Sequence, residues 1–306
     1  MEFISVSEHC HYFKSAVNIG YVFKDGKGML IDSGLEKSTA KKVLRQLIKR
    51  ELPVHYMIVT HAHADHYGGA AYIKKEAPVE VFAPPIEAAI MENPVLEPIY
   101  LWNGAFPMKA LRNKFLEGQP VKVDSLLDCG EQSIGPFQIT AIHLPGHSYS
   151  QYGILVEEIF YAADSYFGVE VLRKHKVPFI VDANATITSL EKVLRLSCSG
   201  FVPGHGEFEK DPTYTIRANI ECHELVKTFI RNLIESVPSG VSMDTIQREM
   251  FEHFDLKARE VGQWLLYRTS FTAYISSLVE DGKVKLTVKD NILWVLSSHK
   301  NSLDLL

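Results

Sequence analysis

The stretch Thr60-His61-Ala62-His63-Ala64-Asp65-His66-Tyr67-Gly68 decides how this chain of 306 residues is interpreted. Histidine and aspartate are costly to bury without partners, so this density of them does not suit an apolar core. Neutral imidazole and carboxylate are good ligands for zinc and similar divalent ions. In an extended segment His61 and His63 point to the same side and can reach one ion. Asp65 and His66, where the chain turns, can face a second ion; a polar loop with chance histidines is the weaker alternative.

The composition and charge of the chain indicate an ordinary globular protein. Its formal net charge of -5 argues against a broad basic surface for nucleic acid. No apolar run approaches the ~20 residues that span a bilayer, and the first residues lack the pattern of a secretory signal. The 4 cysteines are scattered, with no metal-type pair and no disulfide framework. We therefore expect a cytoplasmic protein with free thiols and no membrane association.

Short apolar runs and helical spacings alternate around the histidine stretch. This alternation is typical of a layered α/β domain, in which ligands gather at the carboxyl ends of strands. The histidine stretch follows such a strand directly. We expect strands at 16–23, 28–31, 54–60, 79–83, 121–124, 137–143, 152–156, 159–162 and 200–202, and helices at 36–51, 70–75 and 188–196.

Residues 84–118 interrupt the alternation with several prolines and an apolar run, Ile99-Tyr100-Leu101-Trp102. Long irregular insertions in compact domains are often functional, so this segment can form a lid or a wall of a substrate pocket. It can equally be a helical excursion that packs its aromatic side chains on the core of its own domain. Both interpretations remain open.

The character of the chain changes again near residue 211. Helical spacings at 213–237, 242–254 and 260–280 precede a hairpin of strands at 283–288 and 292–296, an order that resembles a winged-helix module. We predict two domains, a catalytic domain over 1–210 with the 84–118 insertion near the active site, and a helical, winged-helix-like domain over 211–306.

Three further residues share the setting of the histidine stretch. His147 in Pro145-Gly146-His147-Ser148 and His205 in Pro203-Gly204-His205-Gly206 lie in tight turns after strands, and Asp164 lies where a strand ends. Alone, each would be an ordinary loop residue. Their recurrence after a metal-type cluster favours a role as ligands, because two ions ~3.5–4 Å apart need about this many ligands and can share a bridging carboxylate and a bridging hydroxide.

Together these motifs, in this order, resemble the metallo-β-lactamase superfamily over about residues 10–210. The resemblance implies an αββα sandwich with a binuclear metal site at one edge. It assigns one metal to His61, His63 and His147. It assigns the other metal to Asp65, His66 and His205, with Asp164 as the bridge. Asp32 matches a family aspartate that supports the metal-binding loop.

Details of the resemblance narrow the branch of the superfamily. A bridging aspartate is similar to glyoxalase II, the lactonases and the nucleases of the superfamily. His63 stands where the flavodiiron oxygen reductases carry a glutamate, which disfavours that branch. The helical C-terminus is similar to that of members related to lactamase-β-like 2, for which RNA cleavage is known.

The expected chemistry is hydrolysis by a metal-bridging hydroxide at a binuclear centre, with zinc favoured and iron or manganese left open. Asp65 would orient the nucleophile and carry a proton. Tyr149 and Tyr166 are candidate phenols for stabilising an oxyanion, although either can be an ordinary tyrosine at the edge of the core.

Three functions remain open for this chemistry. We favour a hydrolase of a small-molecule thioester, lactone or related ester, because the chain is mildly acidic and the insertion is apolar. The alternatives are a metal-dependent (ribo)nuclease that uses the C-terminal module as a platform, and an iron-dependent sulfur dioxygenase. A small-molecule substrate is expected, nucleic acid is not favoured, and a homodimer is left open.

Overall fold

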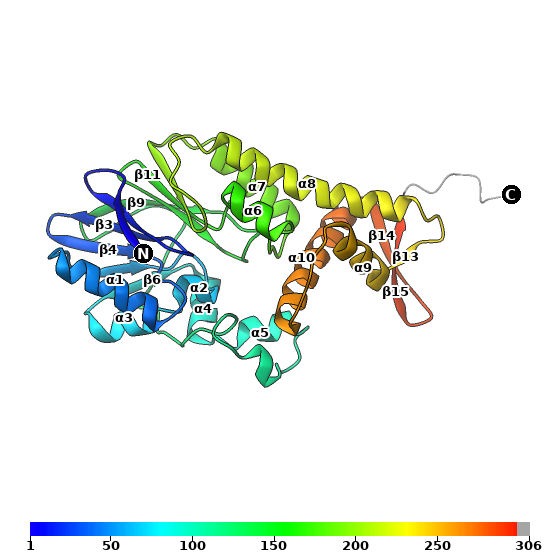
Figure 1. Cartoon of the computed structure of the whole chain (residues 1–306), viewed down its shortest axis with the longest axis horizontal. Coiled ribbons are helices and arrows are strands. Elements are labelled where there is room, and N and C mark those ends of the chain that lie inside the picture. Colours follow the sequence, from blue (N-terminus) through cyan, green and yellow to red (C-terminus); the bar gives the residue numbers. More distant parts are fainter. Residues whose placement is uncertain (299–306) are drawn as a thin grey trace.

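Two β-sheets pack face to face and carry helices on their outer faces (Figure 1). The computed structural model describes residues 1–298 of the chain. In spatial order, the first sheet contains β1 (Glu2–Ser5), β2 (Cys10–Lys14), β3 (Ile19–Lys24), β4 (Lys27–Ile31), β5 (Tyr56–Ile58), β6 (Glu80–Ala83) and β7 (Ser125–Leu126). The second contains β12 (Gly200–Pro203), β11 (Ile159–Ala163), β10 (Tyr152–Val156), β9 (Phe137–His143) and β8 (Gly130–Ile134).

Three apolar layers hold the sandwich together. Between the sheets, Met29 and Ile31 of β4 belong to the same buried cluster as Ile154 and Val156 of β10. The outer face of the first sheet is covered by α1 (Lys37–Lys49) and α3 (Ala70–Glu76), and that of the second by α7 (Ala183–Leu194) and the start of α8 (Thr213–Glu235). This arrangement confirms the predicted α/β sandwich with helices on both faces.

Some elements differ from those expected from the sequence. Strands β1 and β2 precede the first expected strand; β2 buries Cys10 and Tyr12 between the sheets but Phe13 on the other face, so no single-face alternation marks it. Strand β8, which begins at Gly130, was not expected, and the stretch 121–124 is not a strand. The short helix α6 (Val169–His175) was not expected either.

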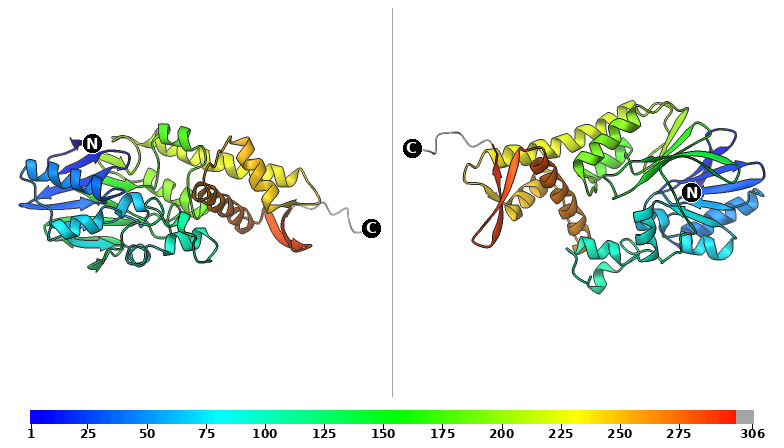
Figure 2. Two further views of the ribbon diagram at one scale, coloured as in Figure 1. Left: turned by 60° about the horizontal axis from the view of Figure 1, so that its bottom comes forward. Right: turned by 180° about the vertical axis from the view of Figure 1, so that it is seen from behind.

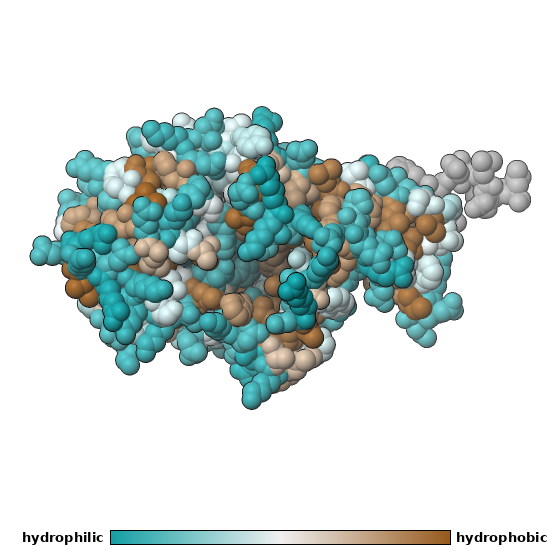
Figure 3. All heavy atoms as spheres, in the orientation of Figure 1, coloured by the Kyte–Doolittle hydropathy of each residue, from teal (hydrophilic) through white to brown (hydrophobic). Residues whose placement is uncertain are grey.

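The 84–118 insertion is helical. It contains α4 (Pro85–Glu92), α5 (Leu96–Leu101) and the 3-10 turn η1 (Lys109–Leu111). Leu101, Leu111 and Leu116 pack on Leu265 of the terminal helix α10 (Val261–Glu280), so the insertion joins the sandwich to the terminal helices. Phe106 and Phe115 of this segment are exposed, and Figure 3 shows apolar side chains near the tip that the segment forms.

The terminal part consists of helices and a small sheet. The helices α8, α9 (Met243–His253) and α10 surround one buried cluster, and β13 (Val241–Ser242) pairs with the hairpin of β14 (Val284–Lys289) and β15 (Ile292–Ser297). Ser242 caps α9, as the sequence predicts.

Helix α8 connects the two parts, because Ile216 packs on the sandwich whereas Val226, Ile230 and Ile234 pack in the terminal cluster (Figure 2). The winged-helix assignment and the boundary at residue 210 remain predictions, and residues 299–306 of the predicted second domain lie outside the described residues. Within residues 1–298, no helix is both long enough and apolar enough to cross a membrane.

Candidate metal centre

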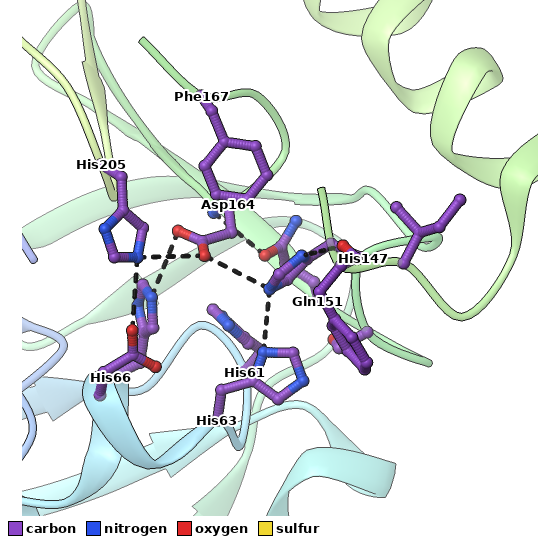
Figure 4. Close-up of polar contacts among 12 residues, drawn as sticks. His61, His63, His66, His147, Gln151, Asp164, Phe167 and His205 are labelled. Carbon is purple, nitrogen blue, oxygen red and sulfur yellow. Dashed lines mark hydrogen bonds and ion pairs between the residues drawn. The ribbon is translucent and has the colours of Figure 1, made fainter. Parts of the chain in front are cut away.

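All seven predicted ligands meet at one edge of the sandwich (Figure 4). His61 and His63 lie in the loop after β5, and Asp65 and His66 in the single-turn helix α2 (Ala64–Tyr67) that follows it. The remaining ligands come directly after strands of the second sheet: His147 after β9, Asp164 after β11 and His205 after β12. The cluster therefore forms because the carboxyl ends of several strands share one edge.

The ligand atoms form three overlapping groups, of which one, His61, His66 and Asp164, lies between the two sets that the resemblance implies. Those of His61, His63 and His147 lie within 4.8 Å of one another, and so do those of Asp65, His66 and His205. The Asp164 carboxylate lies between the groups. Its Oδ1 is 3.2 Å from His66 Nε2, and its Oδ2 is 3.3 Å from His147 Nε2 and 3.4 Å from His205 Nε2. This is the position that a bridging carboxylate needs.

Hydrogen bonds behind the cluster orient the imidazoles. His66 Nδ1 donates to Asp32 Oδ2 at 2.8 Å, and His147 Nδ1 donates to the backbone carbonyl of Phe179 at 3.0 Å. Asp32 is itself fixed by the Thr60 backbone N–H, which donates to Oδ1 at 2.8 Å. Both histidines therefore turn Nε2 toward the centre of the cluster, which is how supporting residues orient metal ligands.

The buried polar atoms at the centre fit a divalent ion. His61 Nε2 is buried and has no hydrogen-bond partner within residues 1–298, and His66 Nε2 and Asp164 Oδ1 are buried and face each other at 3.2 Å without forming a hydrogen bond of good geometry. Such atoms are rare in native proteins and call for an explanation. Imidazole nitrogens and a carboxylate oxygen that converge in this way suit zinc, iron or manganese, and the donor set does not choose among them.

The two groups differ in charge when no metal is bound. Burial, together with the neighbouring His147, lowers the pKa of His63 to about 3, so this imidazole is neutral. Burial also lowers the pKa of His205, but Asp164 and Asp65 outweigh that effect and raise it to about 10. Burial opposes the charge on His66 as well, yet Asp164 and Asp32 hold its pKa well above the usual range. A metal ion that enters the second group must therefore displace protons.

Backbone conformation places Asp164 at the centre. The pairing of β11 with β12 shifts register between Tyr161 and Ala163, and Ala163 has a φ of +49°. Bulges of this kind re-aim the side chain that follows, here Asp164. Gly204 lies against the carboxylate, and a Cβ at this position would come within 2.1 Å of Asp164 Oδ1. Glycine is needed there for space.

The two candidate phenols lie in different places. Tyr149 is 45% exposed and lines a small cavity beside His63, where its ring meets that of Tyr100 edge to face. Tyr166 is 1% exposed and belongs to the apolar cluster beneath α7 and α8. The Tyr166 ring thus packs in the core, its hydroxyl has no hydrogen-bond partner within residues 1–298, and its catalytic role stays a prediction.

Glu87 of α4 is a site residue that the sequence reasoning missed. It is 1% exposed and accepts three hydrogen bonds, from the backbone N–H groups of Ala62 and Ser150 and from Ser148 Oγ, each at 2.8 Å. It thus ties the His61–His63 loop to the His147 turn. A glutamate in the first turn of a helix is ordinarily an exposed partner of the helix dipole, so no sequence signal marked it.

Aromatic rings and one amide complete the surroundings. Phe179 meets His63 edge to face at 5.3 Å, and Phe167 meets His147 at 5.6 Å. Gln151 Oε1 accepts from the Asp164 backbone N–H at 3.1 Å (Figure 4). These rings give the first metal group an apolar wall.

Comparison with known proteins agrees with this geometry. The model of the Metallo-beta-lactamase superfamily matches residues 13–205. An uncharacterized protein of Aquifex aeolicus (strain VF5) is 25% identical over 135 residues, which is 44% of this chain and 56% of that protein. The match thus spans just over half of the relative's own length.

Solved structures share the fold across nearly the whole chain. A beta-lactamase domain protein from Burkholderia ambifaria superposes with a TM-score of 0.73 at 15% identity, over 97% of this chain and 93% of that one. A metallo-beta-lactamase family protein from Thermus thermophilus superposes with a TM-score of 0.71 at 16% identity, over 92% of this chain and 93% of that one. A stereoselective inverting sec-alkylsulfatase from Pseudomonas sp. superposes with a TM-score of 0.62 at 16% identity, over 90% of this chain and 50% of that one. At these identities the likeness concerns the fold alone.

Proposed function

The chain belongs to the metallo-beta-lactamase superfamily, whose members are generally hydrolases, and from this premise we propose that it is a binuclear metal-dependent hydrolase of a small-molecule thioester, lactone or related ester. When bound, two divalent ions would supply an activated bridging water and would polarise the substrate carbonyl. The observation that carries the proposal is the buried Asp164 carboxylate, which lies between the two ligand groups with its oxygens 3.2 Å from His66 Nε2 and 3.3 Å from His147 Nε2.

Asp65 is the residue proposed to move a proton. Its Oδ2 lies 3.3 Å from His205 Nε2, and its side chain is 35% exposed, so the carboxylate reaches the open side of the cluster. Burial raises the pKa of Asp65, but His66 and His205 outweigh that effect and hold it below the usual range. An ionised carboxylate in this position can orient a water molecule and accept its proton.

The walls of the site support an acyl substrate. Phe179 beside His63, with Tyr100 and Tyr149 around the adjoining cavity, makes the approach to the first group largely aromatic. Aromatic surface suits the apolar part of an acyl group better than a polyanion. The net charge of -5 points in the same direction.

A nuclease is the second candidate, and one groove favours it. Between α6 and the start of α10, a hollow of about 400 Å³ is lined by basic side chains, among them Lys174, Lys176, Lys257 and Arg259. Asp255 pairs with Lys176 at 2.8 Å and with Lys257 at 3.2 Å, which weakens the positive potential there. We therefore rank phosphodiester cleavage second.

The test begins with the metal content of the purified protein, followed by turnover of thioesters, lactones and a phosphodiester. His61→Ala and Asp65→Ala remove one ligand from each group, and His253→Ala on α9 is the matched control. We expect both ligand variants to lose metal and turnover while the control keeps them.

Full turnover in both ligand variants would disprove the binuclear hydrolase. Cleavage of the phosphodiester alone, with affinity that falls steeply with salt, would establish the nuclease instead. Bound iron with oxygen consumption would indicate the sulfur dioxygenase.

A further inference from the structure

A small cavity adjoins the first ligand group and is walled by the insertion. Ala62 and His63 form its side toward the cluster, α4 and α5 contribute Glu87, Glu97 and Tyr100, and Tyr149 closes it from the His147 turn. Its volume is about 10 Å³, which is room for one group of the size of a water molecule. The cavity opens beside a metal-ligand candidate, so a ligand in it would lie next to the reacting part of a substrate.

Glu97 is the unexplained residue of this cavity. It is 4% exposed, and its Oε2 is buried without a hydrogen-bond partner within residues 1–298. A buried carboxyl oxygen without a partner destabilises the fold. Glu87, in the same cavity, shows the contrast, because three hydrogen bonds satisfy it and account for its presence. The acceptor capacity of Glu97 is therefore available to a ligand.

The other walls specify the kind of ligand. The rings of Tyr100 and Tyr149 meet edge to face with centroids 5.5 Å apart, and no lysine or arginine lines the cavity in the described part of the chain. A carboxyl oxygen that faces a cavity without a basic side chain attracts a cationic donor through a hydrogen bond. Among the cationic groups of organic molecules, a primary ammonium group has a charged end small enough for a space that holds one water molecule.

Packing holds Glu97 in place. Leu101, one helical turn after Glu97 in α5, is buried against Leu265 of α10, and Figure 1 shows α5 at the end of that helix. The Glu97 carboxyl group thus belongs to a helix, α5, that packs between the sandwich and the terminal part. A rigid acceptor discriminates between ligands better than one on a mobile loop.

We propose that this cavity recognises a primary ammonium group and that Glu97 accepts its hydrogen bonds. Burial raises the pKa of the Glu97 carboxyl above its usual range, and an ammonium group in the cavity would favour the ionised form, so the bound pair gains a charge-assisted hydrogen bond that a neutral amide at this position cannot supply. A further step, which rests on the proposed function, is that the preferred thioester or ester carries a primary amine on its acyl group.

The binding part is tested on the metal-loaded full chain by melting temperature in ethylammonium chloride, tetramethylammonium chloride or sodium chloride at equal ionic strength. Ethylammonium should raise the melting temperature of the wild type and of the control Glu76→Leu, whose carboxylate is exposed on α3, but not that of Glu97→Leu. Tetramethylammonium, which is too large for the cavity, should raise none. The proposal is overturned if ethylammonium raises the melting temperature of Glu97→Leu as much as that of the wild type. It is also overturned if ethylammonium does not raise the melting temperature of the wild type.

Folding of the variant is checked in the same experiment. Without ligand, Glu97→Leu should melt at or above the wild-type temperature, because a buried carboxyl without a partner has been removed. If Glu97→Leu does not fold, the binding of ethylammonium is measured with Glu97→Gln instead. Its amide keeps one acceptor oxygen without the charge, so ethylammonium should bind about tenfold more weakly than to wild type. Unchanged affinity in Glu97→Gln would overturn the proposal.

The substrate part uses two thioesters of one thiol, with β-aminobutyric acid and with its methyl isostere isovaleric acid. Wild type should prefer the amino thioester by about 100-fold in kcat/KM, and Glu97→Leu should bring the ratio near one. The same ratio in both proteins overturns the inference. If neither thioester is hydrolysed while ethylammonium still binds through Glu97, thioesterase activity fails and the ammonium site stands.

Discussion

Asp32 holds His66 by a hydrogen bond of 2.8 Å from His66 Nδ1 to Asp32 Oδ2, and both side chains are buried. Asp32 adopts a φ of +65°, which is uncommon for a residue other than glycine. The strained conformation brings the carboxylate within reach of both His66 and the backbone of Thr60. The pair therefore links the end of β4 to the histidine stretch and orients one ligand of the second group.

Asp32→Asn should weaken metal binding about 10- to 100-fold, because the amide cannot replace both carboxylate oxygens as acceptors. Asparagine tolerates a positive φ, so the backbone should persist. The measurement is metal retained against a competing chelator. Asp25→Asn is the matched control, since Asp25 also has a positive φ, +49°, but lies in the exposed β3–β4 hairpin. Equal retention in the two variants would show that Asp32 does not support the site.

Gly204→Ala should remove metal from the protein. The added Cβ would lie 2.1 Å from Asp164 Oδ1, so the carboxylate must move out of its position between the two groups. Gly282→Ala is the control, because it strains the backbone without crowding a side chain. Its φ of +67° makes alanine strained, but its Cβ would meet nothing within 4 Å. We expect Gly282→Ala to lower the melting temperature without changing metal content, and Gly204→Ala to lower metal content. Full metal occupancy in Gly204→Ala would contradict the central position of Asp164.

The ligand set could be predicted from the sequence because each ligand lies at or just after the end of a strand, where chain order and local turns determine its position. The residues that support the ligands could not be predicted in this way. Glu87 and Phe179 reach the cluster only through tertiary packing, and neither has a local pattern that sets it apart. Tyr166 is the reverse case, because it follows Asp164 closely in the chain while its side chain packs in the apolar cluster beneath α7 and α8. Closeness in sequence does not determine the direction of a side chain near a bulge.

Much of the fold followed from local periodicity, and the exceptions have physical reasons. The spacing of buried residues in α1 and the strands β9 and β10 matched the expected ranges closely. Strand β2 lacked the expected alternation because it contributes to apolar layers on both faces of its sheet. The role of the insertion could not be inferred, because its contact with Leu265 of α10 depends on the packing of a distant helix.

Glu87→Gln should destabilise the protein by about 1–3 kcal/mol, because an amide nitrogen would face one of the three donors that the carboxylate now accepts from. The two ligand-bearing loops that it ties should also loosen, so metal affinity should fall together with stability. Urea unfolding and metal retention measure the two effects. Glu76→Gln, at the exposed end of α3, should change neither. A Glu87→Gln protein as stable as the control would mean that the buried carboxylate does not hold these loops.

His223 gives the contact between α8 and α10 a dependence on pH. It is buried in α8, and its Nδ1 lies 2.7 Å from the Tyr274 hydroxyl of α10. Burial, and to a lesser extent His147, lowers the pKa of His223 from 6.5 to about 4. Between these values the unfolded chain binds a proton that the folded chain does not. Stability from this group is therefore complete above pH 6.5 and is lost as the pH falls toward 4.

The loss across this window should be about 3 kcal/mol, since each unit of pKa difference corresponds to about 1.4 kcal/mol. His223→Asn can keep a hydrogen bond to Tyr274 but does not titrate. The free energy of unfolding of wild type should therefore fall more steeply than that of His223→Asn as the pH is lowered from 7 to 4, and the two curves should run parallel above pH 7. Urea unfolding at a series of pH values measures both. Parallel curves throughout would mean that His223 accepts a proton in the folded protein, so that the contact between α8 and α10 does not depend on its neutral form.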